Sequence, residues 1–244
     1  KNKMKRTIMY LMLLLIAVSC QKNTDKPVHI STEESSSTAI FDSTYGLLAH
    51  FTFNNTLDDV SGNGHEISFE YGKIKFPVGH INSDTSIRSM RIVTPVLMFT
   101  DNFMTFQKTD SFTVSLWIKC NQIYGAGRIL SNEYPEGNFR IVMYETGTYG
   151  VSFAGLTLTD TTGYKKNWVY ITYTYNNGQA KLYRNGTPIA SGVDTSTEEL
   201  HYGPTLGIGV KASEAYDGFI GNMQDLRVYN YDLKAEDILA LSGH

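Results

Sequence analysis

The sequence contains few cysteines, with Cys20 and Cys120 the two among 244 residues. Two thiols are too few for a cysteine-based zinc site or an iron–sulfur cluster, so we exclude both kinds of centre. A chain of this length buries roughly 70% of its unfolded surface and needs no disulfide framework to fold. We expect Cys120 to be a packing residue, since a free cysteine is commonly buried.

The sequence also has few charged residues, and its net charge is slightly negative. Charged residues make up 18% of the chain, and the formal net charge is −3. The first 19 residues hold four of the 21 basic residues and no acid, which leaves 17 basic and 24 acidic residues and a formal charge of −7 beyond them. Nucleic-acid binding needs a basic surface, so we exclude nucleic acid as the main partner and expect a neutral glycan or a protein.

No apolar run is long enough to span a bilayer, because Ile8–Val18 falls well short of the roughly 20 residues that spanning requires. A basic start followed by a short apolar run is typical of a secretory signal. Ser19 and Cys20 come next and resemble a bacterial lipobox, although Ala17 stands where that motif usually has Leu. The resemblance implies cleavage before Cys20 and stable anchoring by several acyl chains. A plain signal peptide with an incidental cysteine is the alternative.

These features predict three segments: a lipoprotein signal at 1–19, a lipidated Cys20 with a polar tether to residue 44, and a domain at 45–244. The expected location is the cell envelope, as an outer-membrane lipoprotein of a Gram-negative bacterium, facing the periplasm or the cell surface. The membrane is contacted through the lipid alone. The tether (21–44) is Ser/Thr-rich and has no apolar periodicity, which favours a flexible stalk.

From Tyr45 onward, short β-rich runs alternate with Gly/Asn/Asp/Ser clusters, which predicts an all-β sandwich or barrel. Expected strands are 46–53, 112–120, 139–144, 149–154, 168–175, 179–184, 187–191, 206–210 and 219–229. In the second of these, Phe112 and the alternate apolar residues face one side and Trp117 faces the other. Asn185-Gly186 predicts a type I′ hairpin turn. Ala235–Leu241 is the one expected helix.

Four segments together resemble the concanavalin A-like lectin/glucanase superfamily, in particular bacterial laminin-G-like domains. They are AHFTFNNTLDDVSGNGHE (49–66), DSFTVSLWIK (110–119), WVYITYTYNNGQAKLYRNGTPIASG (168–192) and DGFIGNMQDLRVYNYDLKAEDILAL (217–241). The resemblance implies a jelly-roll sandwich of two antiparallel sheets with about six strands each, together with one short C-terminal helix. This fold hosts enzymes, lectins and protein-binding modules, so it does not decide the function.

Catalytic patterns are missing from the sequence. Glucanases of this superfamily carry an E-x-D-x-x-E type run on one strand, which places two carboxylates on one face for retaining hydrolysis. No such run occurs, and neither does G-x-S-x-G or H-E-x-x-H. We therefore expect a non-enzyme.

The loop 59–64 suggests a structural calcium site. Asp59, Ser61 and Asn63 offer oxygen atoms at alternate positions before Gly64, and His65 stands where calcium loops use a backbone carbonyl. The family resemblance adds a ligand on the last long strand, where the matching residue is Gln224. The alternative is a turn in which Asp59 and Asn63 cap local backbone amides.

Tyrosines expected in loops supply candidate sugar platforms, because a ring can pack on the C–H face of a pyranose. The candidates that we single out for ligand binding are Tyr134, Tyr149, Tyr202 and Tyr216. The sequence therefore predicts non-catalytic carbohydrate binding in the cell envelope, where the domain could serve polysaccharide capture, with a glycan or an envelope protein as partner. Two alternatives stay open: a protein-binding or adhesion module of the laminin-G type, and a glycoside hydrolase with an atypical acid pair.

Overall fold

Strand β5 (Ser111–Cys120) shows how the sequence builds two apolar layers. Phe112, Val114, Leu116 and Ile118 alternate along it and join the main hydrophobic core. Trp117 points to the opposite face and joins a second, smaller apolar cluster. Because successive side chains of a strand face opposite sides, this one sequence run supports packing on both of its faces. The predicted alternation is confirmed.

The protein is represented by a computed structural model. It describes residues 41–69, 75–81, 85–89, 97–121, 126–132, 138–163, 166–197, 199–202, 206–211 and 218–243. They belong to one compact unit that begins at Phe41. Phe41 packs against the second apolar cluster, and the Tyr229 hydroxyl donates a hydrogen bond to the Ser43 carbonyl. The unit therefore starts four residues before the predicted boundary.

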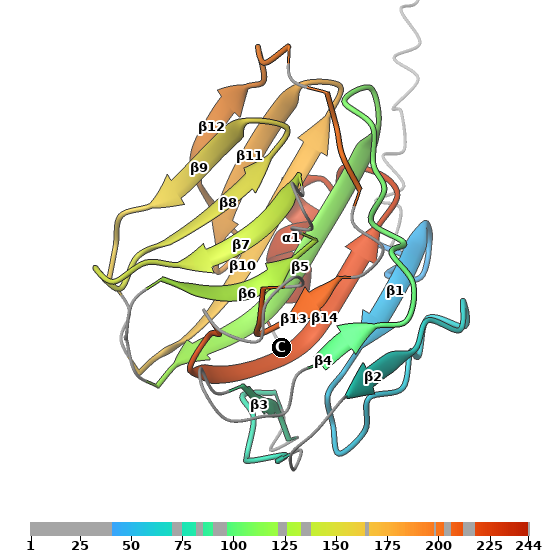
Figure 1. Cartoon of the computed structure of the whole chain (residues 1–244), viewed down its shortest axis with the longest axis vertical. Coiled ribbons are helices and arrows are strands. Elements are labelled where there is room, and N and C mark those ends of the chain that lie inside the picture. Colours follow the sequence, from blue (N-terminus) through green and yellow to red (C-terminus); the bar gives the residue numbers. More distant parts are fainter. Residues whose placement is uncertain are drawn as a thin grey trace, which may run out of the picture. The chain divides into compact units, whose positions relative to one another are not determined.

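The strands of the described residues form two antiparallel sheets that face each other across the main core (Figure 1). The first sheet has the order β1-β14-β5-β10-β11-β12, with β3 also pairing with β14. Besides β5, its strands are β1 (Leu47–Phe51), β3 (Ile87–Ser89), β10 (Trp168–Asn176), β11 (Gln179–Arg184), β12 (Thr187–Val193) and β14 (Gly221–Tyr229).

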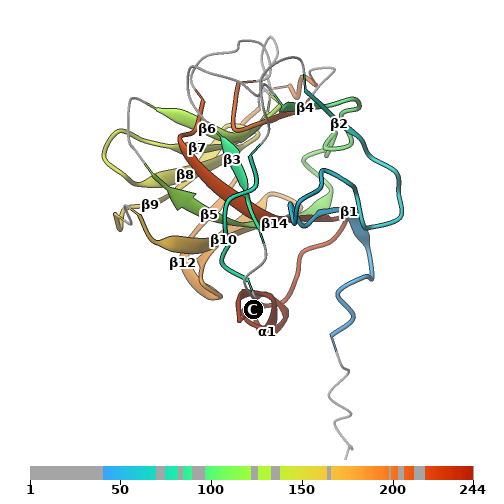
Figure 2. The same ribbon diagram turned by 90° about the horizontal axis from the view of Figure 1, so that it is seen from below.

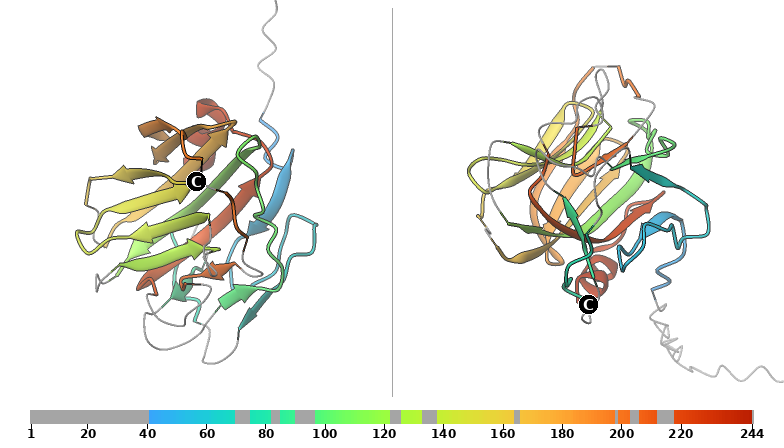
Figure 3. Two further views of the ribbon diagram at one scale, coloured as in Figure 1. Left: turned by 45° about the horizontal axis from the view of Figure 1, so that its top comes forward. Right: turned by 60° about the horizontal axis from the view of Figure 1, so that its bottom comes forward.

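The second sheet has the order β2-β4-β13-β6-β7-β8-β9. Its strands are β2 (Ile67–Phe69), β4 (Leu97–Phe99), β6 (Gly127–Ser131), β7 (Phe139–Met143), β8 (Tyr149–Phe153), β9 (Leu156–Asp160) and β13 (Gly207–Ile208). Figure 3 shows from two further directions how this sheet lies over the first. The core between the sheets is rich in stacked and edge-on aromatic pairs; Phe112, for example, stacks on Phe106 with ring centroids 4.2 Å apart.

The single helix of the described residues, α1 (Ala235–Ser242), packs on the outer face of the first sheet (Figure 2). Its buried residues Ile238 and Leu241 contact the second apolar cluster, which includes Tyr170 and Tyr183. Glu236 and Asp237 in the first turn complement the helix dipole. The outer face of the first sheet is therefore largely covered by protein.

The predicted fold class is confirmed: an all-β, two-sheet antiparallel jelly-roll sandwich with one short C-terminal helix. The described residues form seven strands in each sheet, slightly more than expected. Asn185 and Gly186 join β11 to β12 with φ angles of 48° and 78°, as the type I′ turn requires. Cys120 is buried in the main core, as expected.

The signal segment, Cys20 and the tether up to residue 40 lie outside the described residues, so those assignments stay predictions. Among the residues that are described, no helix has both the length and the apolar character needed to cross a membrane.

Candidate functional site

Polar side chains gather at one end of the outer face of the first sheet, on the hairpin between β10 and β11. Thr174 and Asn176 lie on β10, and Gln179, Lys181 and Tyr183 lie on β11; Thr174 is paired with Lys181 and Asn176 with Gln179. Because paired residues share a face, all five side chains point outward. Asn177 and Gly178 close the hairpin with φ angles of 44° and 89°, which suits a type I′ turn.

The segment between β14 and α1 forms the opposite wall. Thr113, fully buried on β5, fixes this segment in place. Its hydroxyl donates a hydrogen bond to the Tyr231 carbonyl (2.8 Å) and accepts one from the Leu233 amide (2.9 Å). One side chain thus satisfies two backbone groups and holds residues 231–233 against the sheet.

Together the two walls enclose a cavity of about 390 Å³, which we call the hairpin pocket. It is lined by Thr174, Asn176, Asn177, Gln179, Lys181, Tyr183 and residues 232–235. Tyr183 and Leu233 are buried, whereas Asn176, Gln179 and Lys181 are exposed. Burial raises the pKa of the Tyr183 hydroxyl; a hydrogen bond with Thr174 opposes this effect and the charge of Asp232 adds to it. The hydroxyl is therefore a protonated donor at neutral pH.

The donor and acceptor groups of the hairpin pocket suit a polyhydroxylated ligand. Amides of Asn and Gln offer both donors and acceptors, a carboxylate accepts, and an ammonium group donates. Asp232, Lys181 and Lys234 supply three charges, and Tyr183 and Leu233 supply apolar surface beside them. Pockets with a few placed polar groups over an apolar floor are typical ligand sites.

A second cavity of about 410 Å³ lies at the predicted calcium loop and is lined by residues 57–59 and 64–67. The Asp59 carboxylate there is already engaged by donors of the protein. Oδ1 accepts from the His50 amide (3.0 Å) and the Ser61 amide (2.9 Å). Oδ2 accepts from the Ser61 hydroxyl (2.8 Å) and the His65 amide (3.2 Å). Burial acts to raise the pKa of Asp59, but these donors outweigh it and the pKa is lowered.

Asn63 lies next to Asp59 through Ser61, whose hydroxyl contacts both the Asp59 carboxylate (2.8 Å) and the Asn63 side-chain amide nitrogen (3.2 Å). Asn63 turns its amide nitrogen toward the carbonyls of Leu47 (2.9 Å) and Leu48 (2.8 Å). The Gln224 carbonyl oxygen accepts from the amides of His80 (2.7 Å) and Ile81 (3.2 Å).

The His65 ring binds the Asp101 carboxylate at 2.8 Å and stacks on Phe103. Within the described part of the chain, no group of three or more His, Cys, Asp or Glu residues is arranged to hold a metal ion. The contacts of Asp59 match the alternative of an amide-capping turn, and calcium binding at this loop stays a prediction.

Next to Gln224 lies a buried charged cluster that sequence reasoning did not predict. The Asp225 carboxylate binds His50 Nε2 at 2.7 Å and Arg227 Nε at 3.1 Å. Burial would raise the pKa of Asp225, but the hydrogen bond from His50 and the charge of Arg227 lower it. A β-bulge between Gln224 and Arg227, with Asp225 at φ 54°, turns this carboxylate away from the regular ladder. Every charged group in the cluster has a partner, so removing one partner would leave a buried charge uncompensated.

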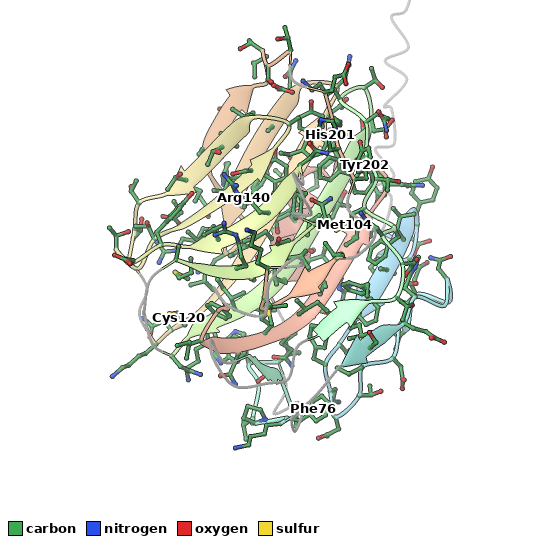
Figure 4. All side chains as sticks on the ribbon, viewed as in Figure 1. Phe76, Met104, Cys120, Arg140, His201 and Tyr202 are labelled. Carbon is green, nitrogen blue, oxygen red and sulfur yellow. The ribbon has the colours of Figure 1, made fainter. Side chains whose placement is uncertain are left out.

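The predicted ligand tyrosines do not form a common platform within the described residues. Tyr134 and Tyr216 lie outside those residues, so their roles stay predictions. Tyr149 begins β8, as the expected strand 149–154 predicts, and its side chain is fully buried because it alternates inward with Val151 and Phe153, so it is not available as a sugar platform. The Tyr202 hydroxyl donates to the Phe106 carbonyl and accepts from Gln107 Nε2 (3.1 Å), beside His201 in Figure 4.

Sequence reasoning missed the hairpin pocket. The alternation of Thr174, Asn176, Gln179 and Lys181 was visible as a polar face, but the wall from Asp232 to Ala235 was not. That wall reaches the hairpin because β14 and β10 both pair with β5, which is a property of strand order.

The comparisons with known proteins agree with this architecture. A laminin G family model, described as the concanavalin A-like lectin/glucanases superfamily, matches residues 96–239. None of the curated proteins matches the chain in sequence.

Among solved structures, the receptor-binding domain of botulinum neurotoxin C/D mosaic serotype is similar with a TM-score of 0.67 and 18% identity, covering 82% of this chain and 51% of that one. The binding domain of botulinum neurotoxin DC, in complex with rat synaptotagmin II, has a TM-score of 0.65 and 17% identity over 82% and 52%. A structure of botulinum neurotoxin type C, whose cell entry depends on two ganglioside molecules, has a TM-score of 0.63 and 20% identity over 82% and 51%.

The chain spans about half the length of these structures, and at such identities the likeness shows the fold alone. The family match is different, because it covers more than half of the chain. The chain belongs to the concanavalin A-like lectin/glucanase superfamily.

Proposed function

We propose that this protein is a non-catalytic glycan-binding lipoprotein of the cell envelope, and that the hairpin pocket holds the glycan. The observation that carries the proposal is the lining of that pocket, where amides, one carboxylate, two ammonium groups and a buried tyrosine surround about 390 Å³. Such groups exchange hydrogen bonds with sugar hydroxyls in place of water. Among the similar toxins, one binding domain is in complex with rat synaptotagmin II and another depends on two ganglioside molecules for cell entry, which supports a binding role here.

A binding role without catalysis follows from the same residues. The hairpin pocket has one carboxylate, Asp232, whereas glycoside hydrolysis in most families uses a pair of carboxylates that flank the scissile bond. The sequence also lacks the E-x-D-x-x-E run of the glucanases in this superfamily.

The anchoring part of the proposal rests on the basic start, the short apolar run and Cys20. Lipidation of Cys20 would hold the domain at the outer membrane through a polar tether. Fractionation of cells that express a Cys20→Ala variant tests this part. The variant should move to the soluble periplasmic fraction, and continued membrane association would contradict the lipid anchor.

The glycan part is tested with an array of bacterial, plant and host glycans probed with the soluble domain. Lys181→Ala removes one charged donor from the hairpin pocket, and Lys75→Ala is the matched control because Lys75 is exposed and does not line the pocket. Loss of one hydrogen bond to a bound sugar is worth about 1.4 kcal/mol, so Lys181→Ala should weaken binding roughly tenfold. Lys75→Ala should leave binding unchanged.

Three outcomes would contradict the proposal. Absence of binding to every glycan, together with capture of an envelope protein, would favour the adhesion alternative. Glycan binding that responds equally to both lysine variants would place the site elsewhere. Release of reducing sugar from a bound polysaccharide would show a hydrolase.

A further inference from the structure

An exposed aromatic pair lies beside the hairpin pocket. Tyr45 is 70% exposed, and it is the one aromatic residue among the exposed large hydrophobic residues of the described chain. Its ring meets Tyr231 edge-on, with ring centroids 5.4 Å apart. Gly46 allows the close approach, because a Cβ atom there would lie 2.6 Å from Tyr231 Cδ1. Gly46 therefore brings the chain at Tyr45 close to Tyr231, and the Tyr45 side chain remains largely exposed.

Strand register places this aromatic pair on the same end of the sheet as the hairpin pocket. Tyr229 on β14 pairs with Thr113, Thr113 pairs with Thr174, and Thr174 pairs with Lys181. Neighbouring strands are about 4.8 Å apart, so β14 lies roughly 10 Å from β10 and roughly 14 Å from β11. The chain that leaves β14 carries Tyr231 and then Asp232, which already lines the pocket. Asp232 thus lies between the two features.

We propose that the aromatic pair and the hairpin pocket are two subsites of one oligosaccharide-binding site. This inference rests on the proposed function and specifies its ligand as a chain of several sugars. Tyr45 precedes β1, which lies one strand beyond β14, so a single sugar in the pocket does not reach Tyr45 across roughly 14 to 19 Å of sheet. A longer chain that crosses Asp232 places a C–H face on the rings while its hydroxyls bind the pocket.

The charged side chains around the pocket indicate whether the ligand is charged or neutral. Lys181 and Lys234 stand beside Asp232 in the pocket, and Glu236 and Asp237 follow in α1. Positive and negative side chains are present in nearly equal numbers, and the aromatic pair carries no charge. A neutral oligosaccharide is therefore the class that this surface fits.

The test compares chain length with the loss of the aromatic ring. Matched monosaccharides and tetrasaccharides of the β-glucan, chitin, mannan and polygalacturonate series are titrated calorimetrically into the soluble domain. The tetrasaccharide of a neutral series should bind at least tenfold more tightly than its monosaccharide. Tyr45→Ala should abolish this difference and leave the monosaccharide affinity unchanged, whereas Tyr45→Phe should preserve it. Val78→Ala, at a residue that is 75% exposed and lies outside the pocket, is the control.

The results that would contradict the two-subsite inference differ from those that would contradict the proposed function. Binding that shows no length dependence, or a length dependence that survives Tyr45→Ala, would overturn the two-subsite inference while the proposed function stands. A preference for polygalacturonate over the neutral series would overturn the assignment of ligand class. No binding by any series at either length would contradict the proposed function and the inference together. An unchanged melting temperature for each variant confirms that the folded domain was tested.

Discussion

The hydroxyl of Thr113 should be worth more to the fold than its size suggests. It is fully buried and bonds both the Tyr231 carbonyl (2.8 Å) and the Leu233 amide (2.9 Å). Thr113→Val keeps the shape and removes both bonds. A buried backbone group left without a partner costs about 1–3 kcal/mol, so the loss of both bonds should destabilise the domain by about 2–4 kcal/mol. At about 2–4 °C per kcal/mol for a domain of this size, the melting temperature should fall by about 5–15 °C.

Urea unfolding followed by tryptophan fluorescence measures the free energy of unfolding, and hydrogen exchange measures protection of the Leu233 amide. Thr113→Ser is the matched control because it keeps the hydroxyl and should retain the protection. Thr113→Val should also weaken glycan binding, since residues 231–233 form one wall of the hairpin pocket. A loss of under about 0.5 kcal/mol, the level of an ordinary surface substitution, would refute the view that Thr113 anchors this wall.

Other perturbations have equally definite outcomes. Phe112→Ala should cost about 3–5 kcal/mol in urea unfolding, because the ring is fully buried among aromatic neighbours, whereas Val193→Ala on the exposed edge strand should cost under about 0.5 kcal/mol. The pKa of Asp225 is lowered from 3.8 in the folded state, so its stabilising effect is present above that pH and is lost as the pH falls through the folded pKa. The difference in free energy of unfolding between Asp225→Asn and the native protein should therefore be largest near pH 7 and smallest at low pH. A difference that stays constant with pH would contradict this. Calorimetry with calcium and then with a chelator should give the same melting temperature, because Asp59 is engaged by protein donors, and a shift of several degrees would show that a calcium site forms.

Local sequence patterns predicted the elements that are long enough to show a periodic spacing of apolar residues. β5 and β10 each have nine or more residues, and their alternation was readable along the whole run. α1 was readable from its acidic first turn and its apolar spacing. Five strands were missed: β2, β3 and β4 have three residues each, too few for an alternation to appear, whereas β9 has five alternating residues and was missed although its pattern was readable. β6 was missed because a bulge between Arg128 and Leu130 interrupts its alternation.

Site residues were harder to predict than strands because a site depends on which strands become neighbours. Tyr149 was correctly predicted to begin a strand, and its two-residue spacing to Val151 already matched an inward face, which argues against a role in ligand binding. Asp59 was read correctly as a residue with several partners, but the sequence could not decide between a cation and backbone amides. Tyr45 and Tyr231 are 186 positions apart, and no local pattern relates them.

The hairpin pocket lies where the segments that cover the outer face of the first sheet end. Along the outer face of β5, β10 and β11, the residues Thr113, Ser115, Trp117, Tyr170, Thr172 and Tyr183 are all buried. α1 and the residues that precede it supply much of this cover, and Gly186 sets how far α1 reaches, since a Cβ atom there would lie 2.9 Å from Leu239 Cα. Beyond the first residue of α1, the same strands continue into Asn176, Gln179 and Lys181, which remain exposed. Most of the outer face of the first sheet is covered by protein, and its uncovered end carries polar side chains. Contacts with a ligand are therefore concentrated at that end. A shift of α1 along the face would therefore change the ligand site without any change in the sandwich beneath it.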